Sequence, residues 1–255
     1  MSEPNGIAEL EVEAVEPKSF FARLGNVYMS PGEAFEEISL APRLAFPIII
    51  LIVISMVAGF YMAGIIDVDS LMAAQMEQAS AQGATPEQMQ AILPTVLKVF
   101  FTVVSPIGSI IIILIVAGFF RVACIIATKE NTYKDLFTVT VYAAVATSII
   151  QTIAIVLTYY LKGPGTVSMA NMGSIVASSL GAILASLFGN DVLPRFFMVL
   201  AQRVEFFAIW KIVLLAIGYS KVTKKMKTTT AATWLGIAYG VVALFFAATG
   251  SFLSP

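Results

Sequence analysis

The sequence contains no histidine and only one cysteine, Cys124. Histidine is the commonest metal ligand in proteins and the side chain that most often changes charge near neutral pH, so its absence argues against a metal centre. A single cysteine cannot form a disulfide within the chain. We therefore expect no metal site and no cofactor.

Charged residues are also scarce. They make up 12% of the chain, whereas 58% of its residues are hydrophobic. This balance lies outside the range of soluble globular proteins and predicts an all-α integral membrane protein, with the lipid bilayer as its first partner. The acidic and basic residues nearly cancel, so net charge gives no reason to expect nucleic acid as a partner.

The segment 1–17 contains five glutamates among small side chains. It has too few apolar residues to bury a face, so we expect a disordered acidic tail. It does not have the pattern of a secretory signal peptide, because its opening is acidic and no apolar core precedes a small-residue cleavage site.

The segment 18–43 is expected to form two short amphipathic helices on the cytoplasmic side. In 19–29, apolar residues recur at helical spacing while Arg23 lies outside their stripe. Such a helix can lie on the membrane surface, or it can pack against the ends of the spans. The pattern alone does not choose between these arrangements.

The second of these helices is marked by its first residues. Ser30-Pro31-Gly32-Glu33 matches a capping box with proline at the first helical position. We expect a helix to begin there and to bury its apolar residues, which are Ala34, Phe35 and Ile38.

The remainder, 44–255, is expected to form a membrane domain with five spans. A helix rises about 1.5 Å per residue, so about 20 apolar residues cross roughly 30 Å of hydrocarbon. The spans are expected at 44–66, 99–120, 137–161, 206–219 and 231–252. Pro106 should interrupt the second span. The acidic segment 67–98 should form a partly helical outer loop with a helix start at Pro86.

The segment 169–189 is uncharged and moderately apolar, and it repeats small residues at every fourth position. These residues are Gly173, Ala177, Gly181, Ala185 and Gly189. Such a stripe lets helix backbones approach closely. A sixth span here would put the densest basic cluster of the chain outside the cell. We therefore expect a re-entrant or surface helix that packs on the bundle between spans three and four.

Lysine and arginine are unevenly divided between the two sides of this scheme. One side holds ten of them and the other holds four. Because cytoplasmic loops carry the positive excess, we expect the N-terminus in the cytoplasm and the C-terminus outside, in a bacterial inner membrane. The densest basic cluster consists of Lys221, Lys224, Lys225 and Lys227. It is foremost a topology signal, with anionic-lipid binding as a second role.

Four polar residues form a candidate intramembrane site: Lys211, Gln151, Glu205 and Arg203. Ionisable groups inside a membrane are costly and usually functional. Lys211 is expected near the depth of Gln151, whose amide oxygen can accept a hydrogen bond from it. The alternative is that Lys211 extends along the span to the headgroups. Arg203 and Glu205 instead fit the outer end of a long helix that begins near Leu193.

Three stretches of the chain together suggest a family. They are Ser30-Pro31-x-x-Ala34-Phe35-x-x-Ile38, the linker 127–136 leading to Val141-Tyr142-Ala143, and the run 209–218 around Trp210-Lys211. In this order and spacing they resemble the bacterial branch of the Yip (Ypt-interacting protein) membrane domain family. The resemblance implies a five-span domain with a cytoplasmic N-terminus. Eukaryotic members are associated with Rab-type GTPases, but their Asp-Leu-Tyr-Gly-Pro signature is absent here, so we carry over no GTPase partner.

Three classes of function remain. An enzyme would need a nucleophile, a base and an orienting group in one site, and the sequence offers no such set. A permease or channel would use a polar centre around Lys211 and Gln151, but no inverted repeat is evident. A non-enzymatic scaffold, trafficking or assembly factor that works through helix packing fits the small-residue stripe and the resemblance. We expect this third class, with a membrane protein or a second copy of the chain as partner.

Overall fold

The computed structural model describes residues 18–69, 71–72, 86–127, 133–167, 176–189, 192–223 and 226–252. The predicted acidic tail 1–17, Gly173, Lys224 and Lys225 lie outside these ranges. Within them the ordered structure is helical, and β pairing is confined to two isolated bridges. The all-helical prediction is therefore confirmed for this part of the chain.

The first helix, α1 (Phe20–Met29), begins where the sequence predicts it. The hydroxyl of Ser19 accepts a hydrogen bond from the backbone N–H of Ala22 and so caps the helix. Leu24 and Val27 are buried, and α1 packs against both the next helix and the central helix of the bundle. This contact favours the packed arrangement over a helix that lies apart on the membrane surface.

Arg23 lies outside the apolar stripe of α1, yet the residue is buried. Only 1% of it is exposed. Its Nη1 donates a hydrogen bond to the carbonyl of Ala41 at 2.7 Å, and its Nε lies 3.7 Å from Oε1 of Glu37. The guanidinium therefore ties α1 to the end of the second helix, a tertiary contact that helical periodicity does not reveal.

The second helix, α2 (Pro31–Leu40), also begins where predicted and buries the three predicted apolar residues. The capping box is wrong in one respect, since the Ser30 side chain makes no capping hydrogen bond. Its backbone N–H instead continues the preceding helix by bonding to the carbonyl of Asn26. Ser30 therefore joins two helices end to end.

Four helical stretches in the described ranges are long and apolar enough to cross a membrane. They are α3 (Ala45–Ile65), the run Gln90–Ile126, α7 (Tyr133–Lys162) and Thr228–Thr249 within α11 (Thr228–Phe252). They correspond to the first, second, third and fifth spans expected from sequence. The helix at the position of the expected fourth span, α10 (Phe206–Val222), has 17 residues.

The second of these stretches is composite. It starts with α5 (Pro86–Val99), passes through a π-helical turn η1 (Phe100–Val104) and continues as α6 (Ser105–Ala127). Pro106 has no N–H to donate, and the π turn just before it shifts the backbone pairing, with the N–H of Ser105 bonding to the carbonyl of Phe100. The predicted interruption near Pro106 is present, and the chain is helical from Pro86, the first described residue of this part.

The chain between α7 and α10 is not one long helix. It forms α8 (Leu180–Phe188) and α9 (Arg195–Arg203), and the helix breaks at Val204 before α10 begins. The break is held by tertiary hydrogen bonds, from Leu180 N–H to the Val204 carbonyl and from Phe206 N–H to the Ser178 carbonyl. The expected helix from Leu193 through Glu205 into the span is therefore wrong.

The core surrounds α7, which contacts α3, α6 and α10. The three stretches that carry the family resemblance meet in this core: Phe35, Tyr142 and Gly218 lie in or against one buried cluster. A Cβ on Gly218 would lie 2.4 Å from Cγ1 of Val139 and 3.0 Å from Cδ2 of Phe35. The absence of a side chain at Gly218 therefore lets α10 approach α2 and α7 closely.

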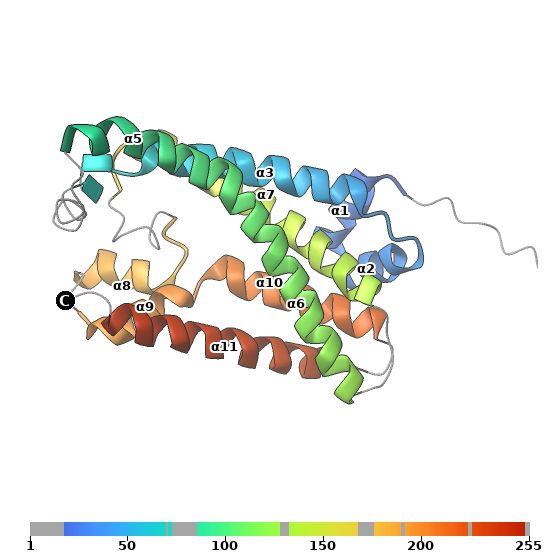
Figure 1. The fold of residues 1–255 in the computed structure, drawn as a ribbon. Helices are drawn as coiled ribbons and strands as arrows, with labels where there is room; N and C mark the ends of the chain where they lie inside the picture. The colour runs from blue at the N-terminus through green and yellow to red at the C-terminus, as the bar shows by residue number, and fades with distance from the viewer. Residues whose placement is uncertain are drawn as a thin grey trace, which may run out of the picture.

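The bundle has two distinct ends (Figure 1). α1 and α2 lie together at one, and the C-terminus lies at the other with α5, α8 and α9. We call these the helix-pair end and the C-terminal end. At the C-terminal end, Ile66 bridges Val167 and Ser179 bridges Glu205, so short backbone pairings tie the loops to the helices there.

Candidate functional site

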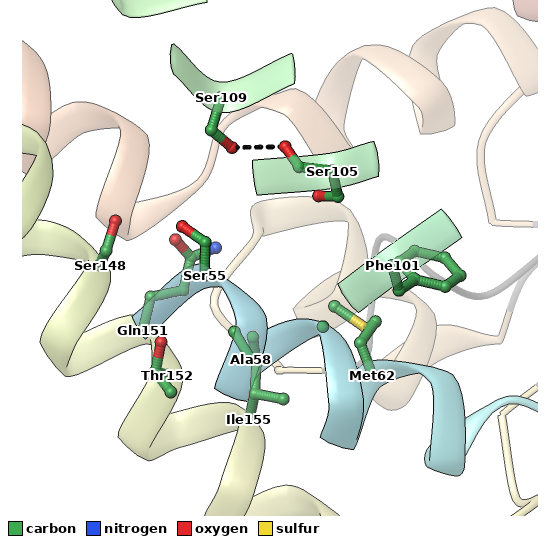
Figure 2. A pocket seen from close by; sticks show the side chains of 11 residues that line it. Ser55, Ala58, Met62, Phe101, Ser105, Ser109, Ser148, Gln151, Thr152 and Ile155 are labelled. Carbon is green, nitrogen blue, oxygen red and sulfur yellow. Dashed lines mark hydrogen bonds between the residues drawn. The ribbon is translucent and has the colours of Figure 1, made fainter. Parts of the chain in front are cut away.

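A polar pocket lies between α3, the η1–α6 segment and α7 (Figure 2). Its volume is about 260 Å³. Six of its lining residues carry hydroxyl or amide groups: Ser55, Ser105, Ser109, Ser148, Gln151 and Thr152. No residue that lines the pocket is charged.

The position of the pocket depends on Gly59. A Cβ at Gly59 would lie only 2.0 Å from the carbonyl oxygen of Phe101 in η1, so α3 and the π turn touch through their backbones. This contact closes one side of the pocket, where Met62 and Phe101 form the apolar wall. The π turn and the glycine together shape the space.

Of the residues predicted for the intramembrane site, Gln151 lines this pocket and Lys211 does not. Lys211 lies on α10, where it is partly buried. In the described ranges its ammonium makes no hydrogen bond or ion pair, and the carboxylate that attracts it electrostatically is that of Glu205. A Lys211–Gln151 hydrogen bond is therefore not among the contacts of the described residues.

Arg203 and Glu205 flank the helix break instead of sharing one helix. The hydroxyl of Ser178 donates to Oε1 of Glu205 at 3.1 Å. The guanidinium of Arg203 lies 4.8 Å from the ring centroid of Phe246 on α11, a cation–π contact. The Tyr239 hydroxyl donates to the Arg203 carbonyl at 2.6 Å. These contacts fasten the break to α11 at the C-terminal end.

The small-residue stripe lies on one helix at only two of its positions. Ala177 precedes α8, whose first turn is capped by the Ser179 hydroxyl, and Gly189 ends α8 with a φ of +90°. Gly181 and Ala185 remain on the helix. A Cβ on Gly181 would lie 2.7 Å from the backbone nitrogen of Gln202 in α9, so close packing is present at Gly181.

The described part of the basic cluster lies at the helix-pair end. Nζ of Lys221 is 3.6 Å from Oε2 of Glu36 on α2, and both side chains are largely solvent-exposed. Lys227 is exposed at the start of α11. The described part of the cluster therefore sits beside the N-terminal helices.

The hydroxyl groups of the pocket were missed from sequence. Serine and threonine are common in membrane helices, and each one alone carries little information. The available signal was their depth, since Ser55, Ser109 and Ser148 each lie near the middle of an apolar stretch. Only the packing of three spans shows that these positions face one another.

The arrangement offers binding groups more than reactive ones. Across the described residues, no three His, Cys, Asp or Glu side chains approach closely enough to hold a metal ion. The pocket places neutral donors and acceptors around a small space, without a base beside a nucleophile. Its chemistry is therefore that of hydrogen-bond recognition.

In a comparison with protein families, the Yip1 domain model matches residues 25–250. Among curated proteins and solved structures, none is significantly similar to this chain. The match spans nearly all of the described helices, from α1 to α11. Together with the apolar helices it identifies an integral membrane protein.

Proposed function

The chain belongs to the Yip1 domain family, and on this premise we propose that it is a non-enzymatic membrane scaffold. It acts as a trafficking or assembly factor by packing its spans against those of a partner membrane protein or a second copy of itself. The proposal concerns protein contacts within the bilayer and involves no chemical step.

The observation that carries this proposal is the shallow burial of three candidate spans. In the most apolar 18 residues of α3, only 22% of the residues are buried inside the protein, and the same share holds for the span in α11. The share is 28% for the Gln90–Ile126 stretch and 56% for α7. Large apolar side chains such as Ile112 and Val241 point away from the bundle. These faces give partner helices room to pack, as membrane helices do through van der Waals contact.

We further infer five crossings, with α10 as the fourth, the N-terminus in the cytoplasm and the C-terminus outside. An odd number of crossings is supported by the opposite positions of the N-terminal helices and the C-terminus (Figure 1). The Lys221–Glu36 contact puts the end of α10 beside α2. At 17 residues, α10 is about 25 Å long, close to the roughly 30 Å of hydrocarbon.

The same orientation puts the basic cluster on the cytoplasmic face, which fits a bacterial inner membrane. Lys221 and Lys227 would then lie at the headgroup level, where each basic residue near an anionic surface contributes about 1 kcal/mol of attraction. Anionic lipids are thus proposed as partners of the cluster in addition to its role in topology.

Site-specific photo-crosslinking in the native membrane tests the scaffold. A diazirine amino acid is introduced at Val241 on α11 or at Ile112 on α6, both exposed, and at Val145 on α7, which is fully buried. The scaffold predicts discrete protein adducts from the exposed positions and crosslinks only within the chain from Val145. Adducts to lipid alone from both exposed positions would contradict it.

Reporter fusions test the topology separately. A fluorescent protein that matures only in the cytoplasm should fluoresce when fused after Lys227 and remain dark when fused after Pro255. Fluorescence from the C-terminal fusion would require an even number of crossings and would revive 169–189 as a span.

A further inference from the structure

Three different spans contribute polar groups to the pocket from the same level of the bundle. Ser55 is the central residue of α3, Ser148 lies at the middle of α7, and Ser109 lies near the middle of the stretch Gln90–Ile126. Because each of these residues lies near the middle of a stretch long enough to cross a membrane, the pocket lies near the centre of the membrane rather than at its surface.

Most of these polar groups have no partner within the protein. In the described ranges, the side chains of Ser55, Ser148 and Gln151 make no hydrogen bond, and the same holds for Ser105 and Thr152. Ser109 is the exception, since its hydroxyl donates to the carbonyl of Ser105 at 3.0 Å. Elsewhere in the bundle, hydroxyls such as those of Thr140 and Thr147 bond to backbone carbonyls.

Unpaired polar groups inside a membrane cost free energy, because lipid tails offer no hydrogen bonds. Figure 2 shows the side chains of Ser55, Ser148 and Gln151 on the same side of the pocket. Groups that converge in this way can be satisfied together by a guest that carries several donors and acceptors. The π turn beside them is a feature that recurs at functional sites.

The lining also restricts the charge and size of the guest. No lysine, arginine, aspartate or glutamate lines the pocket, and an ion without a counter-charge is strongly disfavoured at this depth. The volume of about 260 Å³ far exceeds the roughly 15 Å³ that one water requires, and it lies just below the roughly 300–1,000 Å³ of pockets for drug-sized ligands. A neutral molecule of a few heavy atoms fits both limits.

We propose that this pocket is a binding site for a small uncharged compound with several hydroxyl groups. The guest is either a free polyol or the polyol headgroup of a neutral lipid, since Ser105 is exposed and leaves the pocket open beside α6. Ser55, Ser148 and Gln151 hold its hydroxyls, and Met62 and Phe101 contact its carbon atoms. This inference is independent of the scaffold proposal.

Cysteine protection in nanodiscs tests the site. The reporter is Ser148→Cys in a Cys124→Ala background, with Ser55→Cys as a second reporter in case the first fails to fold. The probe is the neutral reagent 2-hydroxyethyl methanethiosulfonate. The matched control is Ile111→Cys, whose side chain lies on α6 and is exposed outside the pocket. Both reporters should react with the reagent. The control should react at a rate of its own, and addition of a polyol should leave that rate unchanged.

The guest is then added as erythritol in solution or as monoolein in the bilayer. A bound guest lowers the labelling rate by a factor of one plus the ratio of the guest concentration to its Kd. At about ten times Kd, the labelling rate should therefore fall about tenfold. Gln151→Leu should abolish this protection while leaving the reporter reactive. Protection by erythritol identifies a free polyol, and protection by monoolein alone identifies a lipid headgroup.

Two results would overturn the proposal. If neither folded reporter reacts, the pocket is closed to polar molecules. If both react and neither erythritol nor monoolein protects them, the pocket holds water only. Both results leave the crosslinks expected from Val241 unchanged, so failure of this site is distinguishable from failure of the scaffold.

Discussion

The two ends of the bundle are held together in different ways, and α7 passes through both. At the helix-pair end, Leu136 and every residue of 138–147 are buried, and side chains from α2 and α10 close around them. Towards the C-terminal end, only Thr152 and Ile155 of α7 are buried. We therefore call 136–147 the sealed half of α7 and 148–162 its open half.

Polar groups follow the same division. In the sealed half, the Thr140 hydroxyl bonds to the Leu136 carbonyl and lies 2.7 Å from the Tyr219 hydroxyl. In the open half, Ser148 and Gln151 face the pocket without such partners. Satisfied polar groups stabilise a fixed core, whereas unsatisfied ones remain available for binding. The difference separates the part of the bundle that keeps it folded from the part that can recognise a guest.

The contacts between helices differ as well. At the sealed half, Gly218 meets the side chains of Val139 and Phe35. Towards the C-terminal end of the bundle, Gly59 and Gly181 meet backbone atoms of Phe101 and Gln202. Side chains can rotate away from an added group, but backbone atoms move only if their whole segment moves. These two glycines should therefore tolerate less change than Gly218.

The largest effect is expected for Gly59→Ala. The new methyl group would lie 2.0 Å from the Phe101 carbonyl oxygen, and separating α3 from η1 should lower the free energy of unfolding by about 3 kcal/mol, at the upper end for overpacking. Equilibrium unfolding in mixed micelles measures this. Gly108→Ala on α6 is the control, because nothing lies within 4 Å of its added Cβ. Equal stability of the two variants would show that the backbones do not touch.

Gly181→Leu should have the next largest effect. Its side chain would meet Cγ and the backbone nitrogen of Gln202 at 2.6 and 2.7 Å, which should cost about 1 to 3 kcal/mol by separating α8 from α9. Thermal unfolding in detergent provides the measurement, with Gly240→Leu on α11 as a control in open space. An unchanged midpoint for Gly181→Leu would mean that the small-residue stripe faces lipid or solvent.

Tyr219→Phe probes the sealed half and should have a smaller effect. It removes the hydroxyl that lies 2.7 Å from Thr140 Oγ1 but keeps the ring, which stacks on Phe120 at 4.1 Å between centroids. Thr140 keeps its bond to Leu136, so the loss should be about 1 kcal/mol. A double-mutant cycle with Thr140→Val isolates the pair. A coupling energy near zero would contradict the contact.

Lys221→Gln should have the smallest effect on stability. Its ammonium lies 3.6 Å from Glu36 and the two side chains are 45% and 63% exposed, and exposed ion pairs contribute between about 0 and 1 kcal/mol. We expect a loss of less than about 0.5 kcal/mol in mixed micelles. Lys227→Gln, exposed on the same side, is the matched control. A much larger loss for Lys221 alone would make the ion pair a structural contact of the helix-pair end.

Local patterns determined much of the fold. The starts of α1 and α2 follow from Ser19 and Pro31, because a helix start depends on residues within one turn. Four of the five expected spans correspond to helices long and apolar enough to cross a membrane, because the length of an apolar run is itself a property of the sequence. The remaining expected span, the fourth, corresponds to α10, which is shorter at 17 residues.

Tertiary structure decided the features that no local pattern contains. The break at Val204 forms because Ser178 and Leu180 supply hydrogen-bond partners from another part of the chain. Arg23 is buried because the end of α2 offers it a carbonyl and a carboxylate.

The composition of the candidate site was also decided by tertiary structure. Gln151 stood out as a polar residue inside an apolar run, but the sequence could not show that it faces Ser55 and Ser109 instead of Lys211. The sequence alone determines which residues are polar and where each lies within its apolar stretch. Which of them meet was fixed by the close approach of Gly59 to Phe101, because contacts between spans depend on packing across the bundle and not on spacing along one helix.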